Sequence, residues 1–338
     1  MLVFTLRRLL FAIPLLIAAS LIVFLVVNSF PGDPCLAKLG QRASASALAD
    51  CRANLNLDGP LLERYGTFLK GAVVLDFGDD LYSGEDVGGT ILERLQPTLE
   101  LSLVALLIAF LIGMYVGTRS ALRPGSWMDA LGQVLSLGGV SVPVFWLGLM
   151  LISLFGIQLG WLPFSGWSER QIGPDIDYST GCLLFESLFR LEFAAFGRAL
   201  QHIALPAIAL STIPLATITR MARSAMLEEI GKDYVTTARA KGLDEKRVIR
   251  RHVRRNALIP VVTITGLQLG TLLSGAVLTE TVFSWPGLGN HMLQAAEGRN
   301  YPVIMGCMLL FVTTFIVINL VVDLLYAWID PRLRLENR

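Results

Sequence analysis

Charged residues and histidines are scarce in this sequence of 338 residues. Lysine, arginine, aspartate and glutamate together make up 16% of it, histidine occurs three times, and 54% of the residues are hydrophobic. The mean hydropathy of +0.60 is too high for a soluble domain of this length. These deficits exclude an ordinary soluble protein and predict a membrane protein.

The common motifs of catalytic chemistry are also missing. There is no GxxxxGK[ST] run to hold a nucleotide, no HExxH or CxxC pair for a metal, and no GxSxG nucleophile elbow. Nor does the sequence show the chain of intramembrane carboxylates that a proton-driven carrier needs. We therefore predict that the chain is not an enzyme and holds no cofactor or metal. Any energy that it uses must then come from a partner.

Long apolar stretches are what the sequence does contain. Six of them have the length of about 17–25 residues that a helix needs to cross a bilayer. Backbone polar groups within lipid must be satisfied internally, which favours helices over open strands. The predicted fold class is an all-α integral membrane protein with six transmembrane helices. These lie at about residues 9–30, 98–118, 133–156, 200–219, 259–280 and 305–327, and Gly138, Gly139, Ser141 and Pro143 predict a kink in the third.

Basic residues predict the orientation of these helices. With the N-terminus in the cytoplasm, 18 of the 28 lysines and arginines lie on the cytoplasmic side, as the positive-inside rule requires. Both termini are then cytoplasmic. We expect the first apolar stretch to be an uncleaved helix rather than a secretory signal, because its small-residue cluster, Ala18–Ser20, lies in the middle of the run.

The longest polar interruption between apolar stretches runs from Met221 to Pro260 and holds ten of the 28 basic residues. It reads as one helix, LEEIGKDYVTTARAK, a stop at Gly242, and a second helix, DEKRVIRRHVRRNALI, with Asp244 as its N-cap. Such an ordered plan predicts a surface that contacts a soluble partner. A solvated basic face that only fixes the orientation is the alternative.

The first outer loop, residues 31–97, contains an apolar pattern of helical spacing. We expect a helix that lies on the membrane surface or on the outer ends of the bundle, or that serves as a docking platform for a partner. The pattern consists of Leu61, Leu62, Tyr65, Phe68, Leu69 and Val73.

The same loop holds two cysteines. Cys35 and Cys51 lie on the outer side in the predicted topology. In an oxidising compartment they are able to close a short disulfide loop worth about 3 kcal/mol. Two unpaired small residues are the equally simple alternative.

Polar residues in the last two spans are candidates for function. Gln268 and Thr271 either line a substrate path or take part in helix packing. Asp323 lies near the cytoplasmic edge, where we expect it to pair with Arg332 or Arg334 rather than to serve transport. At the outer end of the fifth span, the candidate pathway or outer-gate residues are Glu280, Phe283 and Trp285.

Several segments carry a resemblance to a known family. They are LRRLLFAIP, FPGDP, QPTLEL, RMARSAMLEEIGKDY, DYVTTARAKGL, RNALIPVVT, GLQLGTLLSGAVLTETVFSWPGLG and VDLLYAWIDPRLR. Together they closely resemble the permease subunits of ATP-binding-cassette (ABC) importers for dipeptides and oligopeptides. The resemblance covers nearly the whole chain and is weakest at about residues 35–90 and 165–198. It implies a type I ABC importer permease-like bundle, with a first helix and long outer loop over 1–97 and a five-helix core over 98–338.

The resemblance also implies the partners. They are a second homologous permease, two cytoplasmic ATPase subunits that bind ATP and Mg, an extracytoplasmic solute-binding protein, the peptide substrate and the lipid of a bacterial cytoplasmic membrane. Nucleic acid is not expected. In such importers a short cytoplasmic helix of the permease couples to the ATPase, and here the resemblance assigns coupling to Tyr234, Thr237, Ala238, Arg239, Ala240, Lys241 and Gly242.

One departure from the general importer pattern bears on the substrate. The usual coupling signature has EAA before a downstream glycine, whereas this chain reads TARAK before Gly242, as is typical of the peptide branch. The expected function is therefore ATP-driven import of dipeptides or oligopeptides. Relatives of this type also carry nickel chelates, glutathione or haem, so these remain alternatives. A stand-alone secondary transporter is the alternative of another class, and a membrane enzyme is a more distant one.

Overall fold

The computed structural model describes residues 2–30, 33–40, 42–54, 58–165, 167, 172–173, 178 and 180–329. Within these residues the regular elements are helices, apart from an isolated bridge between Asp79 and Asp86. The predicted all-α fold class is confirmed.

Five helices in this part of the chain are long and apolar enough to cross a membrane, and a bent pair makes a sixth span when it is counted as one. The predicted six spans are thus confirmed, although several helices are longer than expected. The five are α1 (Leu2–Asn28), α5 (Val87–Leu122), α10 (Phe193–Ile230), α13 (Arg254–Val282) and α15 (Tyr301–Ile329).

The bent pair consists of α6 (Trp127–Ser141) and α7 (Val144–Leu151), and π-helical turns continue α7 to Gln158. The two helices meet at 106°. Val142 is extended, with φ −90° and ψ 123°, and Pro143 follows it as the N-cap of α7. A proline disfavours the helical conformation of the residue before it, which explains the predicted break.

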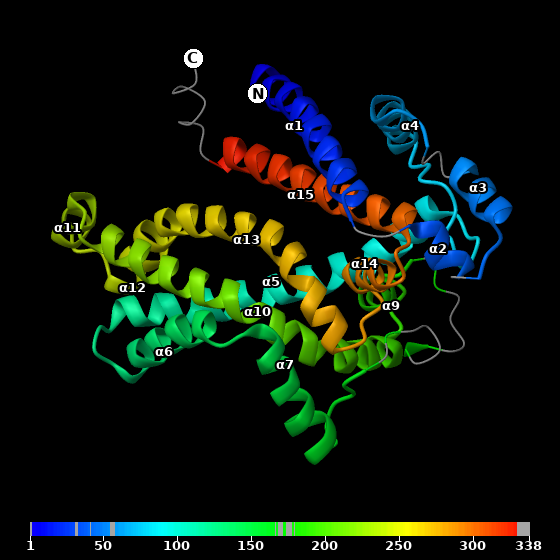
Figure 1. The fold of residues 1–338 in the computed structure, drawn as a ribbon. Helices are drawn as coiled ribbons and strands as arrows, with labels where there is room; N and C mark the ends of the chain where they lie inside the picture. Colours follow the sequence, from blue (N-terminus) through cyan, green and yellow to red (C-terminus); the bar gives the residue numbers. More distant parts are fainter. Residues whose placement is uncertain are drawn as a thin grey trace.

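Helices α5 and α10 form the centre of the bundle (Figure 1). Helix α10 packs against α5, α6 and α13, whereas α1 and α15 pair with each other at one side. Glycine permits the close approach of α5 to α10, because a Cβ on Gly117 would lie 2.6 Å from the carbonyl oxygen of Thr219. Small residues at such crossings are typical of packed membrane helices.

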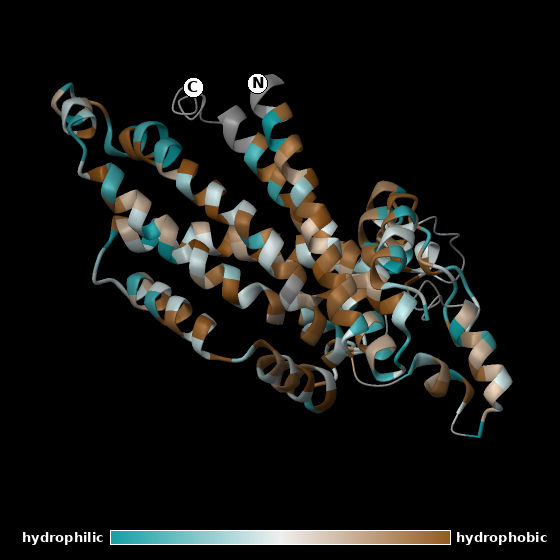
Figure 2. Ribbon diagram, turned by 45° about the horizontal axis from the view of Figure 1, so that its top comes forward, coloured by the Kyte–Doolittle hydropathy of each residue, from teal (hydrophilic) through white to brown (hydrophobic). Residues whose placement is uncertain are grey.

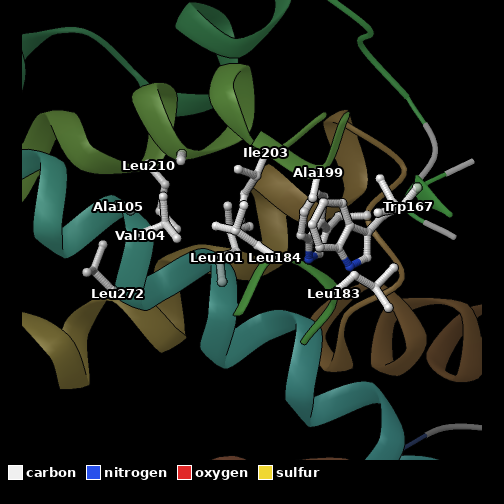
Figure 3. Packing of buried hydrophobic residues seen from close by; sticks show 14 of the residues in the cluster. Leu101, Val104, Ala105, Trp167, Leu183, Leu184, Ala199, Ile203, Leu210 and Leu272 are labelled. Atoms are coloured by element: carbon white, nitrogen blue, oxygen red, sulfur yellow. The ribbon is translucent and has the colours of Figure 1, made fainter. Parts of the chain in front are cut away.

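One large apolar cluster binds α5, α10 and α13 to the second outer loop (Figure 3). Leu101 of α5 and Ile203 of α10 are fully buried in it. The loop contributes Trp167, whose ring stacks on Trp285 with 4.4 Å between the centroids. The short helix α9 (Leu183–Phe189) belongs to the same cluster, so the apolar CLLFESLF stretch covers the bundle rather than crossing it.

The first outer loop folds into three short helices, α2 (Pro34–Leu39), α3 (Ala45–Asn54) and α4 (Leu61–Val73). Helix α4 confirms the helical pattern predicted there. Its Tyr65 hydroxyl lies 3.0 Å from the Ser20 hydroxyl, and Tyr65 and Phe68 both contact the ring of Phe24. This helix therefore packs along α1.

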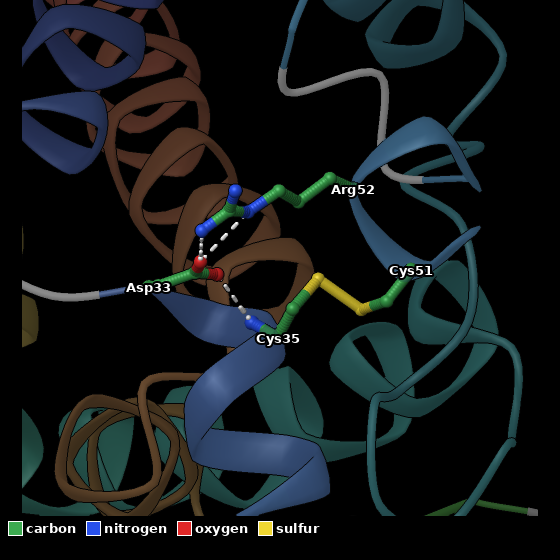
Figure 4. The surroundings of a disulfide bond; sticks show 4 residues. All are labelled: Asp33, Cys35, Cys51 and Arg52. Atoms are coloured by element: carbon green, nitrogen blue, oxygen red, sulfur yellow. Dashed lines mark hydrogen bonds and ion pairs between the residues drawn. A yellow bond between two sulfur atoms is a disulfide. The ribbon is translucent and has the colours of Figure 1, made fainter. Parts of the chain in front are cut away.

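A disulfide joins α2 to α3 (Figure 4). It links Cys35 and Cys51, which is the first of the two alternatives that the sequence left open. Asp33 lies beside it. The Asp33 carboxylate accepts hydrogen bonds from the Cys35 amide at 2.8 Å and from the Arg52 Nε at 2.8 Å, so a covalent bond and an ion pair hold the two helices together.

Hydrophobic residues make up most of α1 and α15, as the colouring by hydropathy shows (Figure 2). Leu10, Phe11 and Ile22 of α1 are each more than half exposed, as expected for a helix that faces lipid. Asp323 of α15 is paired with Arg8 of α1, with 2.6 Å between Nη1 and Oδ2. The expected partners, Arg332 and Arg334, lie outside the described residues.

The polar interruption is shorter in the structure than in the sequence pattern. Helix α10 continues to Ile230 and α13 begins at Arg254, so both spans project beyond the apolar stretches. The expected single helix LEEIGKDYVTTARAK is wrong, because α10 ends with Gly231 as its C-cap and a separate helix, α11 (Asp233–Ala240), follows. Glycine ends helices readily, since it has no Cβ and loses most entropy in a helix.

Candidate functional site: the coupling loop

A compact connection links α10 to α13 at one end of the molecule (Figure 1). It contains α11, then α12 (Glu245–Val248), then π-helical turns over Ile249–Val253 that continue into α13. We call residues 231–253 the coupling loop, after the role that the resemblance in sequence predicts for them. It lies at the opposite end of the bundle from α9 and the disulfide.

Gly242 turns the chain sharply between α11 and α12. Its φ is +77°, a left-handed conformation that costs other residues about 1–2 kcal/mol. Its amide donates to the carbonyl of Arg239 at 2.9 Å, and the Leu243 amide donates to the carbonyl of Ala238 at 3.4 Å. This is a glycine C-cap of the kind that ends many helices, and it confirms the predicted stop.

An apolar core holds α11 against the bundle. Val235 and Ala238 are buried against Val248 and Val253 from the following turns, and against Met226 of α10. The two α11 residues are three apart, so they lie on one side of the helix. The helix therefore has a buried side and a free side.

Tyr234 fixes the position of α11 through its hydroxyl. The hydroxyl donates to the Glu229 carboxylate at the end of α10 and accepts a hydrogen bond from the side-chain Nδ2 of Asn256 in α13 at 3.0 Å. Burial, together with the Glu229 carboxylate, raises the pKa of Tyr234. Three helices thus meet at one phenol group.

Arg239 closes the turn from the other side. Its guanidinium makes two hydrogen bonds to the Glu245 carboxylate, of 3.0 and 2.8 Å. This fork geometry is the specific one for arginine and a carboxylate. Both side chains are partly exposed, so the pair shapes the loop at its surface.

The seven residues predicted for coupling divide into two groups. Ala238 is buried and Tyr234 is half-buried, so these two support the loop from within. The other five are exposed and adjacent, and together they form the free surface of the loop: Thr237, Arg239, Ala240, Lys241 and Gly242. A surface of small and basic residues on a well-fixed turn suits contact with another protein.

The two candidate pathway residues of α13, Gln268 and Thr271, lie away from the side of α13 that packs on α15. On the packed side, a Cβ on Gly266 would lie 2.5 Å from Val322, and one on Gly270 would lie 2.8 Å from Phe315. The small-residue stripe therefore packs against α15. Thr271 is exposed, and its hydroxyl donates to the Gln268 side chain at 3.0 Å.

Glu280, Phe283 and Trp285 are all buried, and they form no open surface in this chain. The Glu280 carboxylate accepts a hydrogen bond from the Thr98 hydroxyl at 2.6 Å and from the Asn290 amide at 2.9 Å. The Asn290 amide belongs to α14 (Leu288–Glu297). Glu280 thus links α13, α5 and α14 at the outer end of the bundle. We call Glu280, Thr98 and the residues bonded to them the outer polar cluster.

The other members of the outer polar cluster were not predicted from the sequence. Thr98 also accepts a hydrogen bond from the Leu288 amide at 2.9 Å, and a Cβ on Gly287 would lie 2.2 Å from Glu280 Oε1. Pro286, Gly287 and Gly289 are residues that favour a turn. Their closeness to a buried carboxylate depends on the long-range packing of α5, which no local pattern encodes.

The comparisons with known proteins agree with this architecture. The model of the family described as binding-protein-dependent transport system inner membrane component matches residues 102–335. The model of its N-terminal component matches residues 1–104. The chain belongs to this family of ABC importer permeases. The resemblance in sequence and the helical bundle therefore lead to the same family.

Individual relatives span the whole chain. The dipeptide transport system permease protein DppB of Escherichia coli (strain K12) is 45% identical over 99% of both chains. The glutathione transport system permease protein GsiC of the same strain is 38% identical, again over 99% of both chains. Among solved structures, an inward-facing form of the MetNI methionine ABC transporter is similar, with a TM-score of 0.50 and 18% identity over 72% of this chain and 97% of that one. That likeness supports the permease fold.

Proposed function

We propose that this chain is the transmembrane subunit of an ATP-driven importer of dipeptides or oligopeptides, in which it forms half of the translocation path. The observation that carries the proposal is 45% identity to a dipeptide permease over 99% of both chains. Because the alignment is full-length, the helices, the coupling loop and the outer helices are all included in it.

In this proposal the coupling loop docks on a cytoplasmic ATPase subunit. The loop is fixed by Tyr234 on its inner side and presents the five exposed residues Thr237 and Arg239–Gly242 on its outer side. ATP and Mg bind to two ATPase subunits, since the sequence has no nucleotide-binding motif of its own. A second homologous permease completes the path, and an extracytoplasmic solute-binding protein delivers the substrate.

Two independent features support the proposed orientation in a bacterial cytoplasmic membrane. The coupling loop and its flanks carry eleven lysines and arginines between Arg220 and Arg255, which favours a cytoplasmic location. The Cys35–Cys51 disulfide lies at the other end of the bundle, and disulfides persist in oxidising compartments. Both features support cytoplasmic termini.

Gln268 and Thr271 are the proposed polar residues of the path. They lie on α13 away from its contact with α15, and Thr271 is exposed in the single chain. In the assembled importer this side of α13 would face the second permease. The outer end of α13 is held in place by three buried residues that do not line the path: Glu280, Phe283 and Trp285.

Glutathione is the second candidate substrate, because a glutathione permease is 38% identical over the whole length. Glutathione is itself a small peptide, so both relatives favour a peptide-sized solute. Nickel chelates and haem are further candidates that only the resemblance suggests.

A transport assay tests the proposal. The permease is purified with its genetically linked subunits and reconstituted into proteoliposomes, and uptake of a labelled dipeptide and of labelled glutathione is measured with and without ATP. We expect ATP-dependent dipeptide uptake that requires the binding protein. Uptake by the permease alone under an ion gradient would instead support a secondary transporter and overturn the proposal.

A further inference from the structure

Asp129, in the first turn of α6, is buried, with 5% of its side chain exposed. Four donors surround its carboxylate. Oδ1 accepts hydrogen bonds from the Ser120 hydroxyl and from Arg223 Nε, the latter at 2.8 Å. Oδ2 accepts from the Gly125 amide at 2.9 Å and from Arg223 Nη2 at 3.3 Å. One carboxylate therefore joins the end of α5, the loop after it, α6 and α10.

This ion pair differs in kind from those at the surface. A buried carboxylate is stable only when it is paired and its oxygen atoms are hydrogen-bonded, and the Asp129 carboxylate meets both conditions. The Arg239–Glu245 pair of the coupling loop is more open, with 58% of the glutamate side chain exposed. The Asp129–Arg223 pair therefore has a fixed geometry, which a flexible surface pair lacks.

A second contact extends the attachment of α6 along α10. Arg220, one turn before Arg223, donates from Nη2 to the Ser136 carbonyl at 3.1 Å. Further along α6, a Cβ on Gly139 would lie 2.7 Å from the Thr212 carbonyl oxygen. The whole of α6 thus lies against α10.

The other half of the bent span, α7, packs on both α10 and the outer end of α13. A Cβ on Gly148 of α7 would lie 3.1 Å from the ring of Phe283, at the outer end of α13. Between the two halves the chain bends by 106° at Val142–Pro143. Any displacement of α6 relative to α7 must be accommodated at this bend.

We propose that Asp129 and Arg223 are positioning residues of the transport cycle, which fasten α6 to α10 so that movement of the coupling loop is carried to α6 and accommodated at the Val142–Pro143 bend. Arg223 lies seven residues before the end of α10 at Ile230, which is about 10 Å along a helix. The proposal rests on the proposed function, because it takes the ATPase subunits as the source of the movement.

A merely structural role makes a different prediction. If the ion pair only stabilised the fold, its loss would lower the amount of active complex, and ATP hydrolysis and uptake would fall together. If it transmits movement, the complex without it still hydrolyses ATP, and uptake per ATP falls. The ratio of uptake to hydrolysis therefore separates the two roles.

The first experiment measures this ratio in proteoliposomes for the whole complex. The variants are Asp129→Asn, Arg223→Gln, the double variant and the conservative Arg223→Lys. The matched control is Arg123→Gln, an exposed arginine near the same loop.

We expect uptake per ATP hydrolysed to fall about tenfold in Asp129→Asn and in Arg223→Gln, the neutral variants, which is within the usual range of coupling between sites. Arg223→Lys should restore part of it, and the double variant should be no worse than the worse single one. Wild-type ratios in the neutral variants, or parallel losses of uptake and hydrolysis, would overturn the proposal.

A second experiment needs no transported substrate. Spin labels are placed at Trp127→Cys on α6 and Lys246→Cys in the coupling loop, both exposed positions, after Cys182→Ser and Cys307→Ala remove the free thiols. With Arg223 present, we expect the same distance between the labels in the nucleotide-free and vanadate-trapped complexes. With Arg223→Gln, the distance should change or broaden on trapping. Identical behaviour of both proteins would contradict the proposal, whereas absence of dipeptide uptake by the wild type would count only against the proposed function.

Discussion

Trp285 donates a hydrogen bond from its indole Nε1 to the carbonyl oxygen of Pro97, at 3.1 Å. Pro97 lies inside α5. The indole thereby joins the end of α13 to α5 at the outer end of the bundle. Glu280 and Thr98 lie next to this bond. The outer polar cluster is therefore a set of neighbouring hydrogen bonds that share the same three segments.

The outer polar cluster should not tolerate an added methyl group at Gly287. In Gly287→Ala the new Cβ would lie 2.2 Å from Glu280 Oε1, and overpacking of this kind costs about 1–3 kcal/mol. We expect a lower melting temperature of the purified complex. Gly197→Ala on α10 is the control, because no atom lies within 4 Å of its added Cβ. Equal melting temperatures for the two variants would contradict this description of the outer polar cluster.

Removal of the Tyr234 hydroxyl should loosen α11. Tyr234→Phe leaves the Glu229 carboxylate and the Asn256 amide without their shared partner, at a cost of about 1–3 kcal/mol. Hydrogen exchange measured by mass spectrometry should then be faster over Asp233–Ala240 and unchanged over the outer helices. The control is Tyr115→Phe, since the Tyr115 side chain is 56% exposed. Unchanged exchange in α11 would argue against a fixing role for Tyr234.

The disulfide should stabilise the outer helices and should be reducible only from outside. Closing a loop of this length contributes about 3 kcal/mol in the chain-entropy model. A membrane-impermeant reductant added to intact cells should make the α2–α3 segment sensitive to external protease, and Cys35→Ser should do so without reductant. Reduction that requires permeabilised cells would contradict the proposed orientation.

Acidification should weaken the attachment of α2 to α3. Burial by itself raises the pKa of Asp33, but the hydrogen bonds from Arg52 and from the Cys35 amide outweigh it, so the pKa lies below the ordinary value of 3.8. The stabilisation is therefore fully present above about pH 4 and is lost as the pH falls through the lowered pKa. Protease sensitivity of residues 33–54, measured from pH 6 downwards, should rise at low pH in the wild type. It should already be raised at pH 6 in Asp33→Asn, and a flat wild-type profile would count against the ion pair.

Much of the fold was predictable because local chemistry determines it. Apolar stretches of sufficient length predicted the spans, Pro143 predicted the break between α6 and α7, and the spacing of Tyr65 and Phe68 predicted α4. Gly242 was identifiable as a stop because few other residues adopt a positive φ. These features depend on neighbours in the sequence.

Other features depend on contacts between distant segments and were not predictable. The sequence pattern did not show that α10 extends to Ile230, because the charged residues beyond the apolar stretch were assigned to a separate helix that continued to Lys241. Asp323 was expected near the arginines that follow it, whereas its partner is Arg8, which becomes a neighbour only when α1 packs on α15. The burial of Glu280 and the pairing of Asp129 with Arg223 have the same origin.

The central claim is that the turn at Gly242 transmits energy from the ATPase subunits, and the uptake of dipeptide per ATP hydrolysed tests it most directly. Gly242→Val forces a β-branched residue into a φ of +77°, and Gly40→Val forces the same residue into a φ of +80° in the outer segment. In the reconstituted complex we expect the ratio to fall about tenfold for Gly242→Val and to stay at the wild-type value for Gly40→Val. A wild-type ratio for Gly242→Val would contradict the account.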